Sequence, residues 1–439
     1  MEEDKVKNKN VEIDEIINQW LLDENTNINS NVDKFLNNFT NIEIKGYENE
    51  ISPIVESVHN KYNNYKFVPF SGEEGEEKIF YNFLSLVLES NIKTTIYILY
   101  EEDISWIGNK SRFIKNIIAL LTEIVKKGNK IKIIQSNNRS SEEMILILEM
   151  ILPVYLLGNL ETYYFPKFKD GLFKHTMIVA KDIASITSTS MNSLPEKRVG
   201  VFTTDKQVYT DSYNQFQEYL KMCSPLLRVI TQKEKNIHFK TIINFEAKKG
   251  NSVIRTEILS PLTIPKDTLV SMIKRENYED EESIIEEFEI KSNNFKNILK
   301  DYSFLEIVSL PSIENIKNGK VKINLFHGLG CKDAYYNIQE FTKHIESVIN
   351  YLKNYDNYSV TIVEKAEDIK GVIYVKEGVG VLISRSTAPY MVLAVTEVKM
   401  TNAFWQYMCY KGLTYNNKED NKIKTIELLE NYLDELKQS

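Results

Sequence analysis

The segment from residue 94 to residue 204 alternates strand-like apolar runs with runs that have the spacing of amphipathic helices. A strand-like run over Thr94–Tyr100 precedes a helical run over Phe113–Val125, and the strand-like run KIKIIQS follows at once. A further helical run, Ser141–Leu157, leads into four closely spaced strand-like runs, LETYYF, HTMIVA, ASITSTS and VGVFTT. This order predicts an α/β fold with a mixed sheet flanked by helices.

The second half of the chain has its own strand-like runs, together with a strongly amphipathic helix predicted over Asp333–Lys353. These features indicate a second module of the α+β type. A chain of 439 residues is also long enough for two or three domains. We therefore predict an acidic helical lead-in over residues 1–59, the mixed-sheet domain over 60–232 and an α+β domain over 233–439.

Negative charge is concentrated in the first sixty residues, which hold five lysines against thirteen Asp and Glu residues. This segment alone accounts for the net charge of −8 of the whole chain, so the remainder is neutral. Proteins that bind DNA usually present a basic surface, because contacts with phosphate dominate their affinity. We therefore expect no direct DNA binding by this chain.

Three cysteines, Cys223, Cys331 and Cys409, stand far apart without a C-x-x-C spacing, so neither a disulfide framework nor a zinc site is predicted. The longest apolar stretch is interrupted by Glu149 and Pro153, and no apolar signal segment opens the sequence. We expect a cytoplasmic protein without a membrane span. With five histidines and no H-E-x-x-H pattern, we expect neither a metal site nor a cofactor.

The segment that begins at His175, HTMIVAKDIASITSTSMN, follows the spacing of a phosphodiesterase motif. Phospholipase D-type enzymes have H-x-K, then Asp seven residues after the His, then G-S-x-N from the fourteenth. In such enzymes the His attacks phosphorus, and the Lys and Asn hold phosphate oxygens. The spacing is matched at His175, Asp182, Ser190 and Asn192.

Two positions depart from this motif: Met177 replaces the lysine, and Thr189 replaces the glycine. Enzymes of this type also need a second copy of the motif, whose His protonates the leaving group, and no second H-x-K triplet continues the spacing. If the chain is nevertheless a phosphodiesterase or nuclease, His175, Asp182 and Asn192 are its catalytic residues. The alternatives are that these residues are remnants packed in an inherited sheet, or that they form a retained pocket.

A retained pocket would bring His175, Asp182, Ser190 and Asn192 together as ligand-binding residues. Alternate side chains of a strand share one face, so Ser190 and Asn192 should point the same way, with His175 on their side. Because Met177 makes such a pocket less cationic, we expect a neutral or weakly anionic small molecule. We expect these four side chains to converge on a cavity.

The run from Phe70 to about Val229 resembles the effector region of Gram-positive bacterial helix-turn-helix transcription regulators of the Xre type. The resembling pieces are FSGEEGEEKIFYNFLSLVL and the run from IKIIQSNN to TSTSMN, with CSPLLRVIT and IYVKEGVGVLI more loosely. The resemblance implies a degenerate phospholipase D-like module, a non-catalytic role in sensing or regulation, and a homo-oligomer. The partner is then a small molecule or a regulatory protein, or the chain is an interaction protein without a ligand. The family's basic DNA-binding head has no counterpart in the acidic first sixty residues.

Overall fold

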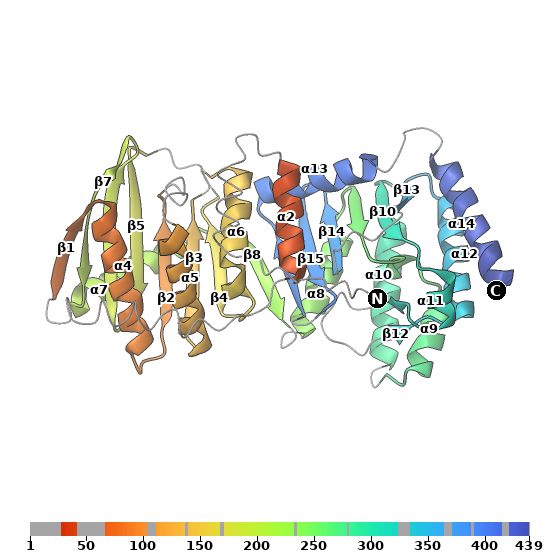
Figure 1. Ribbon diagram of the computed structural model, residues 1–439, viewed down its shortest axis with the longest axis horizontal. Helices are drawn as coiled ribbons and strands as arrows, with labels where there is room; N and C mark the ends of the chain where they lie inside the picture. Colours follow the sequence, from red (N-terminus) through yellow and green to blue (C-terminus); the bar gives the residue numbers. More distant parts are fainter. Residues whose placement is uncertain are drawn as a thin grey trace, which may run out of the picture. The chain divides into compact units, whose positions relative to one another are not determined.

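The computed structural model describes residues 28–41, 66–102, 111–136, 139–166, 171–231, 235–278, 281–323, 334–363, 371–387, 390–414 and 421–438 (Figure 1). The chain forms two compact units, which comprise Met1–Asn31 with Asn41–Arg228, and Val32–Thr40 with Val229–Ser439. The division falls inside strand β8 (Ser224–Thr231), whereas the sequence predicts it after residue 232. Of the predicted lead-in, helix α2 (Ile28–Asn41) belongs mainly to the second unit, and residues 1–27 and 42–59 lie outside the described residues.

The first unit is built on a mixed sheet with the strand order β1-β7-β6-β5-β2-β3-β4-β8. Strands β2, β3 and β4 are parallel, as expected for strands joined by helices, and β5, β6 and β7 form an antiparallel meander beside β2. The strands are β1 (Phe67–Ser71), β2 (Thr95–Tyr100), β3 (Lys130–Gln135), β4 (Leu160–Tyr164), β5 (Phe173–Ala180), β6 (Ala184–Met191) and β7 (Leu194–Thr203).

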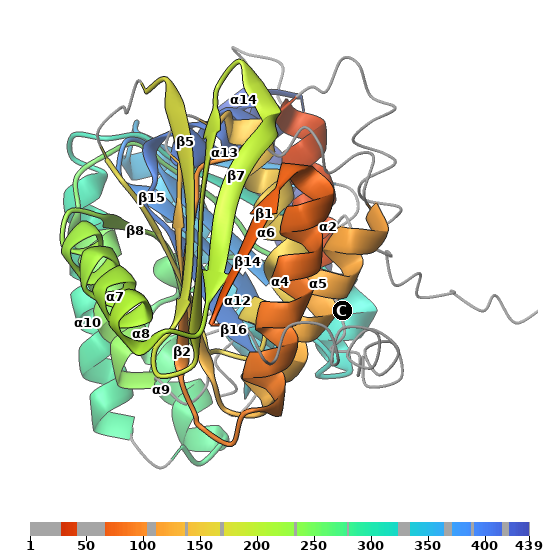
Figure 2. The ribbon, with the colours of Figure 1, turned by 90° about the vertical axis from the view of Figure 1, so that its left-hand side faces the viewer.

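Helices cover both faces of this sheet (Figure 2). One face carries α4 (Gly72–Glu89), α5 (Ser111–Lys126) and α6 (Ser141–Tyr155), and the other carries α7 (Lys206–Leu220). The ring of Tyr97 on β2 packs against Tyr213 and Phe216 of α7, with centroids 5.3 and 5.2 Å away. Because side chains alternate along a strand, Ile98 and Tyr100 face α4, α5 and α6 instead.

Helix α6 begins with a capping box. The Glu143 N–H donates to Ser140 Oγ at 3.2 Å, and the Ser140 N–H donates to Glu143 Oε2 at 3.3 Å. The helix continues through Pro153 and ends at Tyr155, two residues before the predicted end at Leu157. Pro153 has no backbone N–H, so it removes one hydrogen bond in the last turn of the helix.

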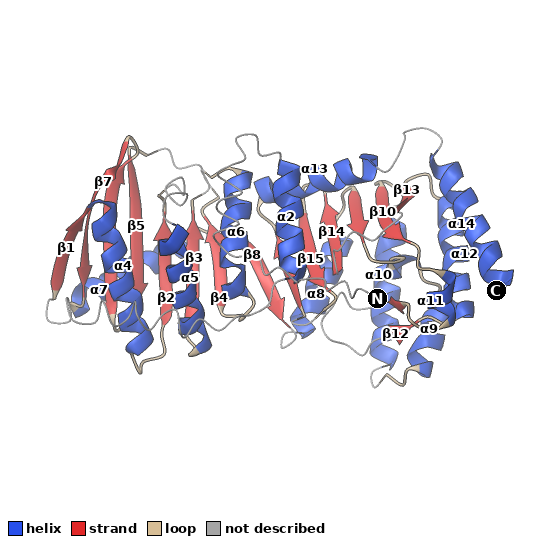
Figure 3. Cartoon of the chain, in the orientation of Figure 1, coloured by secondary structure: helices blue, strands red, loops and turns tan. Residues whose placement is uncertain are grey.

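The second unit contains a mixed sheet with the strand order β16-β15-β14-β9-β10-β13, again flanked by helices (Figure 3). Its strands are β9 (Ser252–Arg255), β10 (Phe304–Ser309), β13 (Tyr358–Val363), β14 (Gly371–Lys376), β15 (Gly380–Arg385) and β16 (Met391–Val395). A separate small sheet pairs β11 (Lys322–Ile323) with β12 (Ala334–Tyr335). The helices are α8 (Lys235–Ala247), α9 (Lys266–Arg275), α10 (Glu281–Ile298), α11 (Ile313–Lys317), α12 (Ile338–Asn354), α13 (Val398–Thr414) and α14 (Asn421–Gln438).

The two units repeat one topology. In each, three parallel strands stand beside a three-stranded antiparallel meander: β2-β3-β4 beside β5-β6-β7, and β9-β10-β13 beside β14-β15-β16. The hairpins correspond residue by residue, because Ala180 pairs with Ala184 and Lys376 pairs with Gly380 across three-residue turns. The middle turn residues, Asp182 and Gly378, both have positive φ, 68° and 65°. The second unit is therefore a second copy of the same arrangement.

The predicted α/β class, with a mixed sheet flanked by helices, is confirmed. The long helix predicted from Asp333 begins only at Ile338, because Asn337 caps it: the Glu340 N–H donates to Asn337 Oδ1 at 2.8 Å. Strands β1, β8, β9, β10, β12 and β16 were not predicted as strands. Among the described helices, none is both long and apolar enough to cross a membrane.

Candidate functional site

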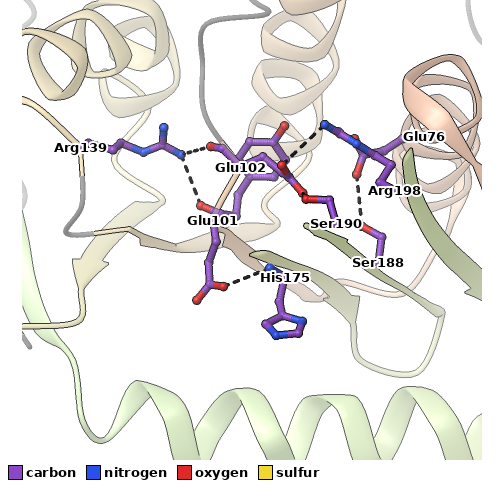
Figure 4. Close-up of polar contacts among 9 residues, drawn as sticks. Glu76, Glu101, Glu102, Arg139, His175, Ser188, Ser190 and Arg198 are labelled. Atoms are coloured by element: carbon purple, nitrogen blue, oxygen red, sulfur yellow. Dashed lines mark hydrogen bonds and ion pairs between the residues drawn. The ribbon is translucent and has the colours of Figure 1, made fainter. Parts of the chain in front are cut away.

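His175 lies near the start of β5 and is exposed, on the face of the sheet that α7 covers. The main-chain N–H of His175 donates to Glu101 Oε2 at 3.0 Å (Figure 4). Its side-chain Nδ1 lies 3.1 Å from the hydroxyl of Thr189 on the neighbouring strand. The His175 carbonyl also accepts from the main-chain N–H of Glu101 at 3.2 Å, and neither Glu101 nor Thr189 carries a positive charge. A phosphate group at His175 would meet a carboxylate where a cation is needed.

Met177 stands two residues after His175, on the same face of the sheet. It packs against a small apolar cluster formed by Leu99, Ile134 and Phe216. The position therefore serves packing between the sheet and α7. A lysine there would have to bring an ammonium group into this apolar cluster. The apolar surroundings therefore suit the methionine better than the motif's lysine.

Ser190 points to the opposite face of the sheet from His175. It pairs with Lys174, whereas His175 pairs with Thr189, and the two pairs face opposite sides. Ser190 is 2% exposed, and its hydroxyl donates to Glu102 Oε1 at 2.6 Å. The predicted convergence of the four motif residues on one cavity is therefore wrong, because adjacent positions of a strand face opposite sides of the sheet and Ser190 points away from His175.

The other two motif residues are Asp182, which lies away from the His175 imidazole, and Asn192, whose side chain binds a main-chain carbonyl. Asp182 occupies the exposed turn after β5, about 17 Å of strand beyond His175 at the usual rise per residue. Its positive φ is a conformation that Asp tolerates better than most residues. Asn192 is exposed, follows an irregularity in the β6 ladder, and donates its amide to the Gly171 carbonyl at 2.5 Å.

The face opposite His175 holds a buried ion cluster that the sequence did not reveal (Figure 4). Arg198 of β7 pairs with Glu76 of α4, and its other terminal nitrogen lies 3.6 Å from Glu102. Ser188 donates to Glu76 at 3.2 Å, and Ser190 donates to Glu102. The sequence could not predict this ion pair, because Arg198 on a strand and Glu76 in the first turns of a helix follow no motif, and only the folded sheet brings them together.

Burial raises the pKa of Glu76, and the attraction of Arg198 offsets this only in part. The second carboxylate, Glu102, adds to the increase because it repels the charged form. For Arg198, burial lowers the pKa, but the surrounding acidic groups outweigh burial and keep the guanidinium charged. One guanidinium shared by two buried carboxylates thus leaves the pKa of Glu76 above its ordinary value.

The repeated topology locates the position in the second unit that corresponds to His175. His175 lies five residues before Ala180, and Gly371 lies five residues before Lys376, at matching places in the two hairpins. A Cβ atom at residue 371 would lie 1.9 Å from the Ser384 carbonyl oxygen, closer than any real contact. The second copy of the motif therefore has no histidine here, and its backbone leaves no room for one.

Metal or thiol chemistry has little support in the described residues, where no group of three or more His, Cys, Asp and Glu side chains could hold a metal ion. Burial raises the pKa of both Cys223 and Cys409 to about 11, which keeps these thiols protonated and weakly nucleophilic. Cys331 lies outside the described residues.

No family model and no curated protein matches the chain. Among solved structures, the archaeal chromatin protein TrmBL2 is 15% identical, with 40% of this chain and 60% of that chain covered and a TM-score of 0.27. NucT from Helicobacter pylori is 16% identical, with 36% and 98% covered and a TM-score of 0.26. The phospholipase D family member Nuc from Salmonella typhimurium is 13% identical, with 36% and 96% covered and a TM-score of 0.26. The chain spans 60% of the length of the chromatin protein, and scores of this size assign it no activity or partner.

Proposed function

We propose that this chain is a non-catalytic regulatory or signal-sensing protein, similar to the effector part of the bacterial transcription regulators that its sequence resembles. It acts through contacts with a ligand or with another protein. The observation that carries the proposal is Gly371: a phosphodiesterase of the two-motif type needs a second histidine, and this position has no room for any side chain. Without that histidine, the leaving group has no general acid.

The surroundings of His175 support the same conclusion. Met177 packs in an apolar cluster where a phosphodiesterase needs a cation, and the Glu101 carboxylate lies beside the His175 backbone. Ser190 faces the other side of the sheet. A bound phosphodiester would therefore find an exposed nucleophile but no positive charge to hold its oxygens.

A phosphodiesterase assay tests the chemical half of this proposal. Bis-para-nitrophenyl phosphate and single-stranded DNA are incubated with the purified chain and with His175→Ala, and we expect neither protein to cleave either substrate. Turnover by the wild type that disappears in His175→Ala would overturn the non-catalytic reading. It would establish the alternative, a phosphodiesterase or nuclease that uses His175, with Asp182 and Asn192 as candidate catalytic residues.

A transcript comparison tests the regulatory half. Strains that lack the gene, carry the wild type, or carry His175→Ala are compared by transcript sequencing. We expect deletion to change a defined set of transcripts and His175→Ala to restore them as well as the wild type does. Unchanged transcripts after deletion would contradict a regulatory role and favour an interaction protein of another kind.

Partners and location follow as part of the proposal. We propose a homo-oligomer that works in the cytoplasm and takes a small molecule or a regulatory protein as its partner. The neutral charge beyond residue 60 supports a role without direct DNA contact. Light scattering of the purified chain at several concentrations tests the oligomer, and a monomer throughout the micromolar range would contradict it.

A further inference from the structure

The first unit contains a cavity of about 180 Å³ between the sheet and the helices α4, α5 and α6. It lies on the face of the sheet opposite His175, since Ile98 and Tyr100 of β2 line it. It is therefore separate from the motif residues. Its lining includes Phe80, Phe113, Ile117, Ile133 and Gln135.

The walls of this cavity are apolar. Isoleucines of α5 and α6 form one side, Ile98 and Ile133 form the floor, and the rings of Phe80 and Phe113 meet edge to face with centroids 6.4 Å apart. Several of these side chains are only half-buried, because part of their surface faces the cavity. An apolar cavity of roughly 150 Å³ in another protein stays dry and binds benzene, so this volume suits one aromatic ring with a small substituent.

Two residues of the cavity lining carry side-chain polar atoms that have no partner in the described part of the chain. The Tyr100 hydroxyl and Gln135 Oε1 are both buried and have no hydrogen-bond partner among the residues that the structure describes, and Gln135 is 6% exposed. The two residues stand opposite each other on β2 and β3, so their side chains leave the sheet side by side. Burial raises the pKa of Tyr100 far above its ordinary value, so its hydroxyl stays neutral and can donate. Buried polar atoms in native proteins nearly always find a partner, and a ligand can supply it here.

The charged residues of the cavity lining favour a neutral ligand. Arg198 already pairs with Glu76, and Arg139 donates to the main-chain carbonyls of Glu102 at 2.7 Å and Tyr100 at 3.4 Å. Among the described residues, the lining holds three glutamates and these two arginines. A carboxylate or phosphate would therefore enter a region with no excess of positive charge, whereas a neutral hydroxyl would not be repelled.

We propose that this cavity binds a small neutral aromatic molecule with one hydroxyl or ring N–H group, of the phenol or indole class. The ring contacts the isoleucines and Phe80, and the polar group exchanges hydrogen bonds with Tyr100 and Gln135. This binding does not depend on the proposed regulatory role, because it is a property of the purified chain. If it coexists with that role, it supplies the signal that the protein senses.

Calorimetric titration of the full chain with three probes that share the ethylbenzene skeleton tests the proposal. The probes are 4-ethylphenol, ethylbenzene and 4-ethylbenzoate. We expect 4-ethylphenol to bind about tenfold more tightly than ethylbenzene, which is the effect of roughly one net hydrogen bond. We expect 4-ethylbenzoate to bind most weakly. Preference for the benzoate, or no binding of 4-ethylphenol at millimolar concentration, would overturn the proposal.

Two variants locate the binding. Ile117→Phe fills the cavity from α5 and should abolish binding of 4-ethylphenol, whereas Ile290→Phe, at an exposed position of α10 in the second unit, should not change it. Gln135→Met removes the polar partner and should reduce the preference for 4-ethylphenol over ethylbenzene by about tenfold, with Gln207→Met on the surface as its control. Each variant's unfolding temperature confirms that it folds. Unchanged binding in a folded Ile117→Phe variant would contradict this site.

Discussion

Arg198 and Glu76 form an ion pair in which the side chains are only 2% and 7% exposed. The pair joins the meander strand β7 to helix α4, so it ties that helix to the sheet. Because Glu102 lies 3.6 Å from the same guanidinium, one cation is shared by two carboxylates. The serine hydroxyls of Ser188 and Ser190 complete the cluster. The face of the sheet opposite His175 is thus a polar structural core with an apolar cavity beside it.

Replacing Arg198 with methionine should destabilise the first unit by about 3 to 5 kcal/mol. The substitution keeps much of the side-chain volume but leaves two buried carboxylates without their cation, and breaking a buried pair from one side costs about this much. Hydrogen exchange of the amides in α4 and β7 measures the effect in this unit alone.

The control for this variant is Lys197→Met, on the neighbouring position of the same strand, whose side chain is exposed. Exposed substitutions of this kind usually change the free energy of unfolding by less than about 0.5 kcal/mol. Equal stability of the two variants would show that the buried cluster does not hold α4 on the sheet.

Restoring the lysine of the motif by Met177→Lys should destabilise the chain and create no phosphodiesterase. The side chain packs against Leu99, Ile134 and Phe216, so a lysine must either bury its ammonium group or turn away and leave a gap. We expect a loss of roughly 1 to 3 kcal/mol, the usual cost of a disturbed core position. Urea unfolding followed by circular dichroism measures this loss, and the phosphodiester assay measures activity.

Met177→Leu is the matched control, because it keeps the volume and the apolar character and should cost less than about 1.5 kcal/mol. Phosphodiester cleavage gained by Met177→Lys would show that this missing cation is the main defect of the motif. We expect no gain of cleavage, since Gly371 would still stand where the second histidine is needed.

The class of the fold could be predicted from the sequence because its helices and strands follow each other with clear apolar spacing. The helix that carries Ile117, Ile118 and Leu121 is an example. The repeat was not detected, because the two hairpins share a pattern of small and β-branched residues, and no histidine marks the second one. IYVKEGVGVLI and MIVAKDIASIT show the signal that could have revealed it, namely the equal spacing around the turn.

The site was predicted less well than the fold. The spacing of the motif correctly located a hairpin, but the direction of each side chain depends on register, and Ser190 lies one position out of step with the face of His175. The cavity could not be predicted, because its lining comes from three helices and three strands that only the folded sheet brings together. Gln135 looked like the end of a strand, and nothing in the sequence marked it as buried.

The chain alone should show no sequence-selective binding to duplex DNA near physiological salt. Residues 1–60 carry −8 and the remainder is neutral, so few counterions would be released on binding. A gel shift with random and promoter-derived duplexes at two salt concentrations measures this. Sub-micromolar binding that prefers one sequence would contradict the expectation, and a steep salt dependence would reveal a basic surface that the net charge conceals.

The second unit should lose stability as the pH rises toward 9, in part through Glu306. Burial raises the pKa of this carboxyl on β10 to about 8, although nearby Tyr358 opposes the increase. The folded chain then keeps the proton up to about pH 8, whereas the unfolded chain loses it near the ordinary value of 4.5. Its contribution to stability is complete below pH 4.5 and is lost as the pH rises through 8.

Glu306→Gln keeps the shape and the neutral charge, so it should remove this dependence. Between pH 6 and pH 9 we expect the stability of the variant relative to the wild type to increase by about 2 to 3 kcal/mol, the linkage value for this pKa. Glu246, whose pKa burial raises to about 7, leaves a residual slope of the same sign in both proteins. Below about pH 6.5 His344 offsets part of this slope: burial lowers its pKa to about 3, so the unfolded chain binds a proton there that the folded chain does not. Urea unfolding at each pH gives these values, with exposed Glu282→Gln as the control, and equal pH profiles for Glu306→Gln and the wild type would show that Glu306 ionises without cost in the folded chain.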